Sequence, residues 1–173
     1  EKDALAQIEN ITADNARLVS NLHANLGGLY RMNGHPDLAR EHMEKSISLL
    51  DQFNLLHIND SIPQIANYAM FLTEQQEPER GISELQKLSG IIKEYHSDDC
   101  LDYAKVQETL GTIYLMTANL PQAKTHFKRA FKIYEKIWAD EPEMIEAKYQ
   151  EIQELYPQIG FCIGKNLSGL LTK

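Results

Sequence analysis

The feature that most constrains this chain of 173 residues is a pattern that recurs every 42 residues. Its clearest copy begins with Leu110, Gly111 and Tyr114 and continues past Pro121 to Phe127. On two consecutive helices, this spacing places small residues where the backbones approach closely and large residues in the gap between them. The small residues of this copy are Gly111, Ala123 and Ala130. The copy therefore predicts a helix-turn-helix unit in which Gly111 faces Ala123.

Other copies lie at steps of 42 residues from Leu110, at the equivalent positions Leu26, Tyr68 and Ile152. The second copy is degenerate, but it keeps the small-residue contact through Ala69 and Gly81. In the fourth copy Gln153 stands where a small residue is expected. The sequence thus predicts helix pairs over residues 14–54, 60–96 and 99–139, followed by a degenerate or capping unit over 142–172.

The pattern of residues 108–130 resembles the tetratricopeptide repeat. The wording ANLGGLY around Leu26, together with the 42-residue step, is similar to the kinesin light chain type of this repeat, which also occurs in bacterial peptide-sensing regulators. The resemblance covers roughly residues 15–139. It implies an all-α, right-handed superhelical solenoid of antiparallel helix pairs, forming a single domain over residues 1–173.

Prolines and capping residues mark the expected helix boundaries. Pro36, Pro78 and Pro121 are expected in the first turn of the second helix of each pair, where a missing N–H is tolerated. The expected caps of the first helices are, in chain order, Asp14 or Thr12, the cluster at 59–61 and the cluster at 97–99. Residues 2–11 are expected to form a short helix left from an earlier unit, so the chain is expected to be a fragment of a longer protein.

Two apolar faces follow from the same periodicity. The first helix should bury the positions Leu18, Leu22, Leu26, Leu29 and Tyr30. The C-terminal segment carries an apolar set with no polar helix after it: Ile159, Phe161, Ile163, Leu167, Leu170 and Leu171. Terminal repeats need a polar outer face, so this segment is expected to fold over the last layer as a capping helix. The alternative is that the segment forms a homo-oligomer contact.

Charge and cysteine usage exclude several classes of partner. Seventeen basic residues stand against 25 acidic ones, for a net charge of −8, which argues against binding to nucleic acid or to an anionic membrane surface. Cys100 and Cys162 fit no ligand spacing and are expected to be free thiols in a reducing compartment. The sequence has no stretch of transmembrane length and no signal peptide, so a cytoplasmic location is expected.

The sequence offers no recognisable catalytic or metal-binding motif. None of its six histidines is paired at i, i+3 or i, i+4 spacing, and the HExxH pattern is missing. His35 and His42 lie seven residues apart, but two ligands are too few for zinc. Cys100 lies near a helix start, yet it has two neighbouring carboxylates and no recognisable base. We therefore expect no enzyme activity, no metal and no cofactor.

What remains is a binding surface. In tetratricopeptide proteins the first helix of each pair lines the concave wall, so the resemblance implies that residues at i, i+4, i+7 and i+11 outside the core face a ligand. The predicted peptide-binding residues are Asn21, Asn25, Arg31, Asn67, Met70, Lys105, Thr109, Thr112 and Met116. The expected function is non-catalytic binding of a protein or peptide segment in the groove. The alternative is a ligand-sensing regulatory segment of a larger signalling or transcription regulator.

Asn25 and Asn67 are the most informative members of this set. They lie 42 residues apart and so occupy equivalent places in adjacent units. An amide offers both a donor and an acceptor, which suits an extended peptide backbone, and the related families use asparagines at this place to hold peptides. The competing interpretation is that asparagine is merely tolerated at an exposed helix position, but asparagine is a mediocre helix former. Arg31 and Lys105 are expected to attract an acidic side chain or a C-terminal carboxylate.

Overall fold

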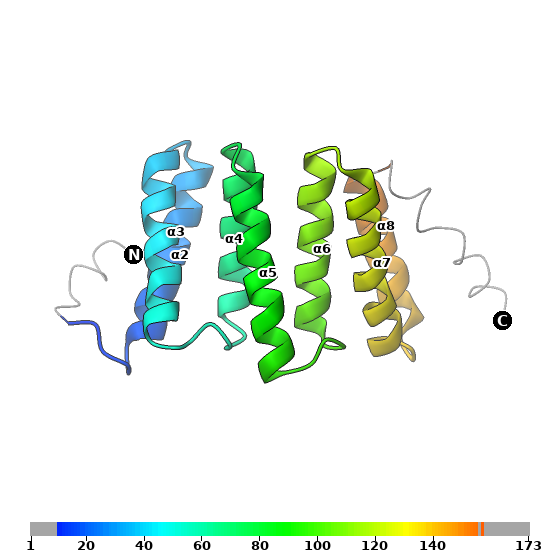
Figure 1. The fold of residues 1–173 in the computed structure, drawn as a ribbon, viewed down its shortest axis with the longest axis horizontal. Helices are drawn as coiled ribbons and strands as arrows, with labels where there is room; N and C mark the ends of the chain where they lie inside the picture. Colours follow the sequence, from blue (N-terminus) through cyan, green and yellow to red (C-terminus); the bar gives the residue numbers. More distant parts are fainter. Residues whose placement is uncertain (1–9, 156, 158–173) are drawn as a thin grey trace. The chain divides into compact units, whose positions relative to one another are not determined.

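The structure is a computed structural model that describes residues 10–155 and Pro157 (Figure 1). The described residues form helices and no strand. In chain order the helices are α2 (Ala16–Met32), α3 (Pro36–Gln52), α4 (Ser61–Glu74), α5 (Pro78–Tyr95), α6 (Leu101–Met116), α7 (Leu120–Ile137) and α8 (Pro142–Leu155). Close packing joins α2 to α3, α4 to α5 and α6 to α7. The predicted all-α fold of consecutive helix pairs is confirmed.

The chain divides into two compact units at the boundary between His96 and Ser97. The first unit contains the α2–α3 and α4–α5 pairs, with additional packing of α4 against both α3 and α2. The second contains the α6–α7 pair, against which α8 packs. The α2–α3, α4–α5 and α6–α7 pairs lie within residues 14–54, 60–96 and 99–139, and the division into repeat units at these bounds stays a prediction. A single domain over residues 1–173 stays a prediction.

The turn inside each pair has the same backbone conformation, repeated at steps of 42 residues. Gly34, Gln76 and Ala118 have positive φ angles of 73°, 65° and 58°. One residue later, an amide N–H donates to the carbonyl five residues back: His35 to Tyr30 at 2.9 Å, Glu77 to Leu72 at 2.8 Å and Asn119 to Tyr114 at 2.7 Å. This is the left-handed closure that ends many helices. Three identical turns at steps of 42 residues therefore confirm the register.

Small residues hold the helices of each pair close together. A Cβ atom on Gly81 would lie 2.6 Å from the carbonyl oxygen of Ala69, so the predicted Ala69–Gly81 contact is confirmed. A Cβ on Gly111 would lie 2.8 Å from the ring of Phe127. Its nearest neighbour is therefore Phe127, one turn beyond the predicted Ala123, although Ala123 is itself fully buried.

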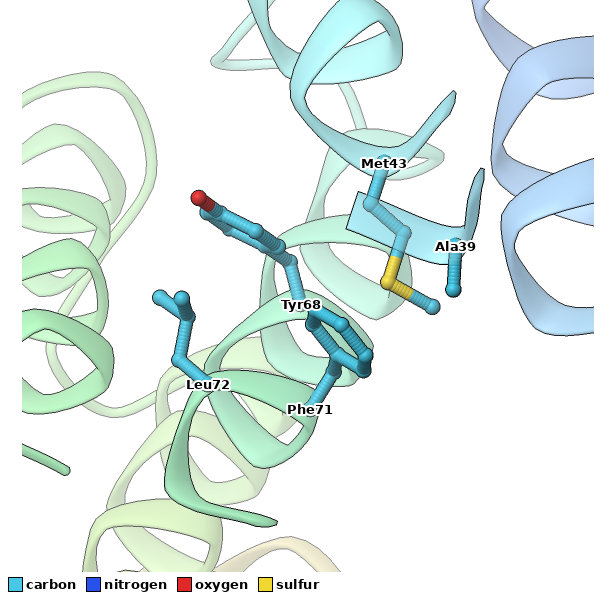
Figure 2. Packing of buried hydrophobic residues seen from close by; sticks show 5 residues of the cluster. All are labelled: Ala39, Met43, Tyr68, Phe71 and Leu72. Atoms are coloured by element: carbon cyan, nitrogen blue, oxygen red, sulfur yellow. The ribbon is translucent and has the colours of Figure 1, made fainter. Parts of the chain in front are cut away.

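A buried cluster joins the two pairs of the first unit. Ala39 and Met43 of α3 pack against Tyr68, Phe71 and Leu72 of α4, and Met43 extends toward the ring of Phe71 (Figure 2). Met43 and Phe71 are 4% and 1% exposed, so this contact is closed to solvent. Apolar burial of this kind is the main term that stabilises stacked repeats.

The apolar face predicted for α2 is only partly buried. Leu26 is buried, but Leu18 and Leu29 are 57% and 47% exposed. Leu29 lies 42 residues before Phe71, which is covered by α3 of the preceding pair. Within the described residues no helix pair precedes α2, so its equivalent face stays uncovered.

Two of the predicted helix caps are wrong in detail. The residue that precedes α2 is Asn15, whose Oδ1 accepts from the backbone N–H of Thr12 at 2.8 Å and caps no helical N–H. The cap of α6 is Cys100, whose Sγ accepts from the N–H of Tyr103 at 3.4 Å. A side chain can cap only where its backbone already turns into the helix, and at α6 this is one residue after the predicted cluster.

Helix α8 is held by aromatic and ionic contacts. Tyr149 stacks on Phe131 of α7 with ring centroids 4.2 Å apart. The ammonium of Lys148 lies 2.8 Å from Glu108 of α6, and the Tyr134 hydroxyl donates to the same carboxylate at 2.6 Å. The burial of Tyr134 and the negative charge of Glu108 raise the pKa of this hydroxyl. Ile152 of α8 is buried like Leu26, Tyr68 and Leu110, as the register predicts.

Several predictions lie outside the described residues. They are the thiol of Cys162, nearly all of the helix over residues 2–11 and the capping segment with its apolar set after Pro157. Asn10 and Ile11, at the end of that expected first helix, are not helical.

Candidate binding pocket

A pocket of about 460 Å³ lies in the first unit, between α2 and α4, with α3 contributing to its floor. Four predicted ligand residues line it: Asn21, Asn25, Arg31 and Asn67. The rest of its lining is Ala24, Gly28, Met32, Met43, Ser46, Asp60, Pro63 and Gln64. Met70, also predicted, is half-buried on α4 and does not line this pocket. The structure therefore brings together the predicted residues of the first two units, Met70 excepted.

Asn25 and Asn67 are the free amides of the pocket. Both are exposed to solvent. Within residues 10–155 neither side chain has a hydrogen-bond partner, in contrast to the other polar side chains around them. Because an amide carries two donors and an acceptor with two lone pairs, this pair leaves a large hydrogen-bonding capacity facing the pocket.

The polar floor of the pocket is saturated by internal hydrogen bonds. Oε1 of Gln64 accepts from the hydroxyls of Ser20 and Ser46, at 2.8 and 2.5 Å. Both serines are almost fully buried, so these bonds satisfy groups that water does not reach. Nε2 of Gln64 in turn donates to Oδ1 of Asn21 at 2.5 Å. The network links α2, α3 and α4 and fixes the floor.

Asn21 belongs to this floor and is not a free amide. Its Nδ2 lies 3.4 Å from Oδ2 of Asp60, which also accepts from Nε of Arg17 at 2.7 Å. The hydrogen bond from Arg17 lowers the pKa of the Asp60 carboxyl below its ordinary value, with help from Asn21. An ion pair between α2 and the residue that precedes α4 thus lies beside the pocket, and both sides of the Asn21 amide are engaged.

A second ion pair, between α2 and α4, involves the lining residue Arg31. Nε of Arg31 donates to Oε2 of Glu74 at 2.8 Å, and the guanidinium makes a second bond to Oε1 of the same carboxylate. The two side chains are 33% and 35% exposed. This two-point geometry is the strong form of the arginine–carboxylate contact. The guanidinium that was expected to receive an acidic ligand already holds Glu74.

The remaining wall of the pocket is apolar and open. Met32 is 84% exposed at the end of α2, and Pro63 is exposed at the start of α4. A Cβ atom on Gly28 would meet no other atom within 4 Å. A side chain at position 28 would therefore extend into the pocket without disturbing the helix contacts.

The other predicted ligand residues lie on α6, in the second unit. The hydroxyls of Thr109 and Thr112 donate to the carbonyls of Lys105 and Glu108 in their own helix, at 2.9 and 3.1 Å. Met116 is 47% exposed, and Lys105 is exposed with no acidic partner among the described residues. A ligand-binding role for these four residues stays a prediction.

Sequence reasoning missed the floor of the pocket. Ser20, Ser46 and Gln64 come from three helices, and no local spacing links a serine on α3 to a glutamine on α4. The available signal was that the repeat has Ile62 and Ala104 at the positions equivalent to Ser20. A hydroxyl at a core position implies a hydrogen-bond partner, although it does not identify that partner.

A second polar site, unexpected from the sequence, lies between α2 and α3. Nδ1 of His23 is 2.8 Å from Nδ1 of His42, and the ring of Tyr30 stacks on His42 with centroids 5.3 Å apart. The seven-residue spacing of His35 and His42 therefore does not produce a direct pair. In the part of the chain that the structure describes, no three His, Cys, Asp or Glu residues are placed to hold a metal ion.

Comparison with known proteins supports the resemblance over part of the chain. Residues 61–136 match the tetratricopeptide repeat model. This part of the chain is tetratricopeptide repeat sequence. The crystal structure of BtubC (BKLC) from P. vanneervenii superposes on the chain with a TM-score of 0.74 and 17% sequence identity, covering 99% of this chain and 71% of that one. No curated protein sequence matches the chain.

At this level of identity, the likeness to BtubC shows the fold. It confirms the all-α helical solenoid fold and agrees with the helix pairs described above. Tetratricopeptide repeats are generally protein-interaction scaffolds. Within residues 10–155, no helix of this protein has the length and apolar character needed to span a bilayer.

Proposed function

We propose that this protein is a non-catalytic scaffold that binds an extended peptide or protein segment in the pocket between α2 and α4. The observation that carries the proposal is the pair of free amides, Asn25 and Asn67, on the wall of one pocket at equivalent repeat positions. An extended backbone presents alternating donors and acceptors, which two such amides can satisfy. A cytoplasmic location and the alternative of a regulatory segment in a larger protein stay predictions.

The saturated floor also supports peptide binding over catalysis. The hydroxyl, amide and carboxylate groups of Ser20, Ser46, Gln64, Asn21 and Asp60 are all engaged with one another. None of them is left as an activated nucleophile beside a base, which an enzyme of the acyl-transfer class needs. A rigid floor with free amides at the wall favours recognition without chemistry.

The first test is a selection from a phage-displayed library of random peptides on the immobilised protein. The substitution Gly28→Leu should abolish capture of the selected peptides, because its side chain fills the pocket while its Cβ meets no neighbour within 4 Å. The matched control is Gly90→Leu, at a glycine of α5 that also meets nothing within 4 Å and does not line the pocket. Capture that survives Gly28→Leu would show that recognition occurs on another face.

The second test removes the two amides. Each lost hydrogen bond to a peptide backbone reduces binding by about 0.5–1.5 kcal/mol, so Asn25→Ala with Asn67→Ala should weaken a selected peptide severalfold to about a hundredfold. The melting temperature should stay nearly unaltered, since both side chains are exposed. The control is Gln52→Ala with Gln86→Ala, which removes two exposed amides outside the pocket. Equal affinity of the test and control variants would contradict the role of the two asparagines.

A further inference from the structure

The charges around the pocket of the first unit cancel in pairs. Its lining contains two charged residues, Arg31 and Asp60. Arg31 is held by Glu74 in a two-point contact, and Asp60 is held by Arg17 at 2.7 Å. One pair joins α2 to α4 and the other joins α2 to Asp60, the residue that precedes α4, so neither charged lining residue is left without an oppositely charged partner.

We infer that this pocket selects an uncharged extended segment with an apolar side chain, and that Glu74 sets this selectivity by occupying Arg31. The inference rests on the proposed function and deepens it, since it names the class of ligand for the same pocket. It also replaces the expectation, based on Arg31 as an isolated basic residue, that the pocket attracts carboxylates.

An acidic ligand gains little at Arg31. A ligand carboxylate that bound the guanidinium would displace the carboxylate of Glu74, so one ion pair would replace another. The displaced Glu74 would then lie unpaired beside a second negative charge. This is unfavourable because both side chains are partly shielded from water, which strengthens the repulsion. The same reasoning applies with opposite sign at Asp60, where a ligand cation would have to displace Arg17.

The uncharged part of the pocket fits an apolar side chain. The uncharged lining of the pocket includes Gly28, Pro63 and Met32, and Met32 is 84% exposed. Methionine is flexible and polarisable, and such surfaces adapt to apolar side chains of different shapes. The free amides of Asn25 and Asn67 then hold the backbone on either side.

The test compares selections from a phage-displayed library of random twelve-residue peptides on three proteins. These are the wild type, Glu74→Gln, and the double variant Arg31→Gln with Glu74→Gln. Only peptides whose capture is lost on Gly28→Leu count as pocket ligands. For the wild type they should contain fewer Asp and Glu residues than the unselected library. Glu74→Gln should raise their acidic content, and the double variant should return it to the wild-type level.

A direct measurement follows on one selected peptide and a version with one Asp in place of an uncharged residue. Fluorescence anisotropy should show that Glu74→Gln tightens the Asp peptide by up to about fivefold, the range of a partly exposed ion pair. The gain should shrink at high salt and be missing from the double variant. Circular dichroism checks that all variants stay helical.

The outcomes separate the two proposals. Acidic pocket ligands for the wild type, or no response to Glu74→Gln, would overturn the selectivity while leaving peptide binding in place. If no selected peptide depends on Gly28, the proposed function itself fails, and the selectivity fails with it.

Discussion

At the scale of single residues, the facing imidazoles of His23 and His42 form a contact whose stability should depend on pH. Their Nδ1 atoms are 2.8 Å apart, so one nitrogen carries the shared hydrogen and the other accepts it. Protonation of both rings would place two N–H groups face to face. Burial lowers the pKa of His23, and the neighbouring charges of His42 and Lys45 lower it further, against an opposing contribution from Glu41.

The pH dependence of stability follows from that direction. Because the pKa of His23 is lower in the folded chain than its ordinary value near 6.5, the unfolded chain binds this proton first as the pH falls. The stabilising contribution is therefore present above about pH 6.5 and is lost as the pH falls through the folded pKa. Thermal melts at pH 7.5 and 5.5 should show a larger loss for the wild type than for His23→Gln.

The second unit already contains the residue pair that the His23→Gln variant would create. At the equivalent positions 84 residues later, Gln107 accepts from Nδ1 of His126 at 2.9 Å, and Tyr114 stacks on that histidine. A Gln–His pair keeps its hydrogen bond when the histidine is protonated, because Nδ1 carries a hydrogen in both states. If His23→Gln and the wild type lose the same stability between the two pH values, the histidine pair is not responsible.

The residue scale is also where prediction from sequence was least complete. Asn25 and Asn67 could be identified because repetition at 42 residues marks equivalent surface positions. The hydrogen bond of Gln64 to Asn21 and the ion pair of Arg31 with Glu74 could not be predicted, because each joins residues 43 apart on separate helices. Such contacts depend on rotamers and on the separation of two packed helices, and a linear pattern contains neither.

At the scale of helices, α5 contains two glycines that should respond to the same substitution with opposite signs. A Cβ on Gly81 would lie 2.6 Å from the carbonyl oxygen of Ala69, whereas a Cβ on Gly90 would meet nothing within 4 Å. Gly81→Ala should therefore lower the free energy of unfolding by about 1–3 kcal/mol through overpacking. Gly90→Ala should raise it by about 0.5–1 kcal/mol, because alanine favours the helix.

Urea unfolding measures the change in the free energy of unfolding for both variants, and each variant serves as the control for the other. Equal responses at the two positions would mean that α4 and α5 do not approach as closely at Gly81 as the structure has them.

Helix positions were predictable to within a few residues, since prolines and periodic apolar residues mark them. The exposure of Leu18 and Leu29 could not be predicted from the sequence, because burial of a helix face depends on whether another helix covers it.

At the scale of the whole molecule, the packing contacts within each compact unit connect helices that are close in sequence. Stability in such repeats is approximately a sum of local terms. Gly111→Leu should overpack the contact with the buried Phe127 ring and cost about 1–3 kcal/mol. Native-state hydrogen exchange should then accelerate in residues 97–155 much more than in residues 10–96.

Equal acceleration in both units would show instead that the chain unfolds as one cooperative domain. An unchanged exchange pattern and an unchanged melting curve would contradict the placement of Gly111 against Phe127. Gly90→Leu serves as the control for adding the same side chain at an unobstructed helical glycine.

Each of the three helix pairs has a residue with positive φ in its internal turn, so these turns can be compared as copies of one unit. The same backbone conformation is adopted by Gly34, Gln76 and Ala118, although only glycine adopts it without steric strain. The flanking helices, and not the residue in the turn, therefore impose this geometry. Reading the copies against one another separates what the architecture requires from what each unit is free to vary. By that criterion the close-packed small residues are required in every pair, whereas the amides of Asn25 and Asn67 give way to Thr109 in α6. If the proposed peptide binding holds, a difference of this kind between units would set which part of a ligand each unit contacts.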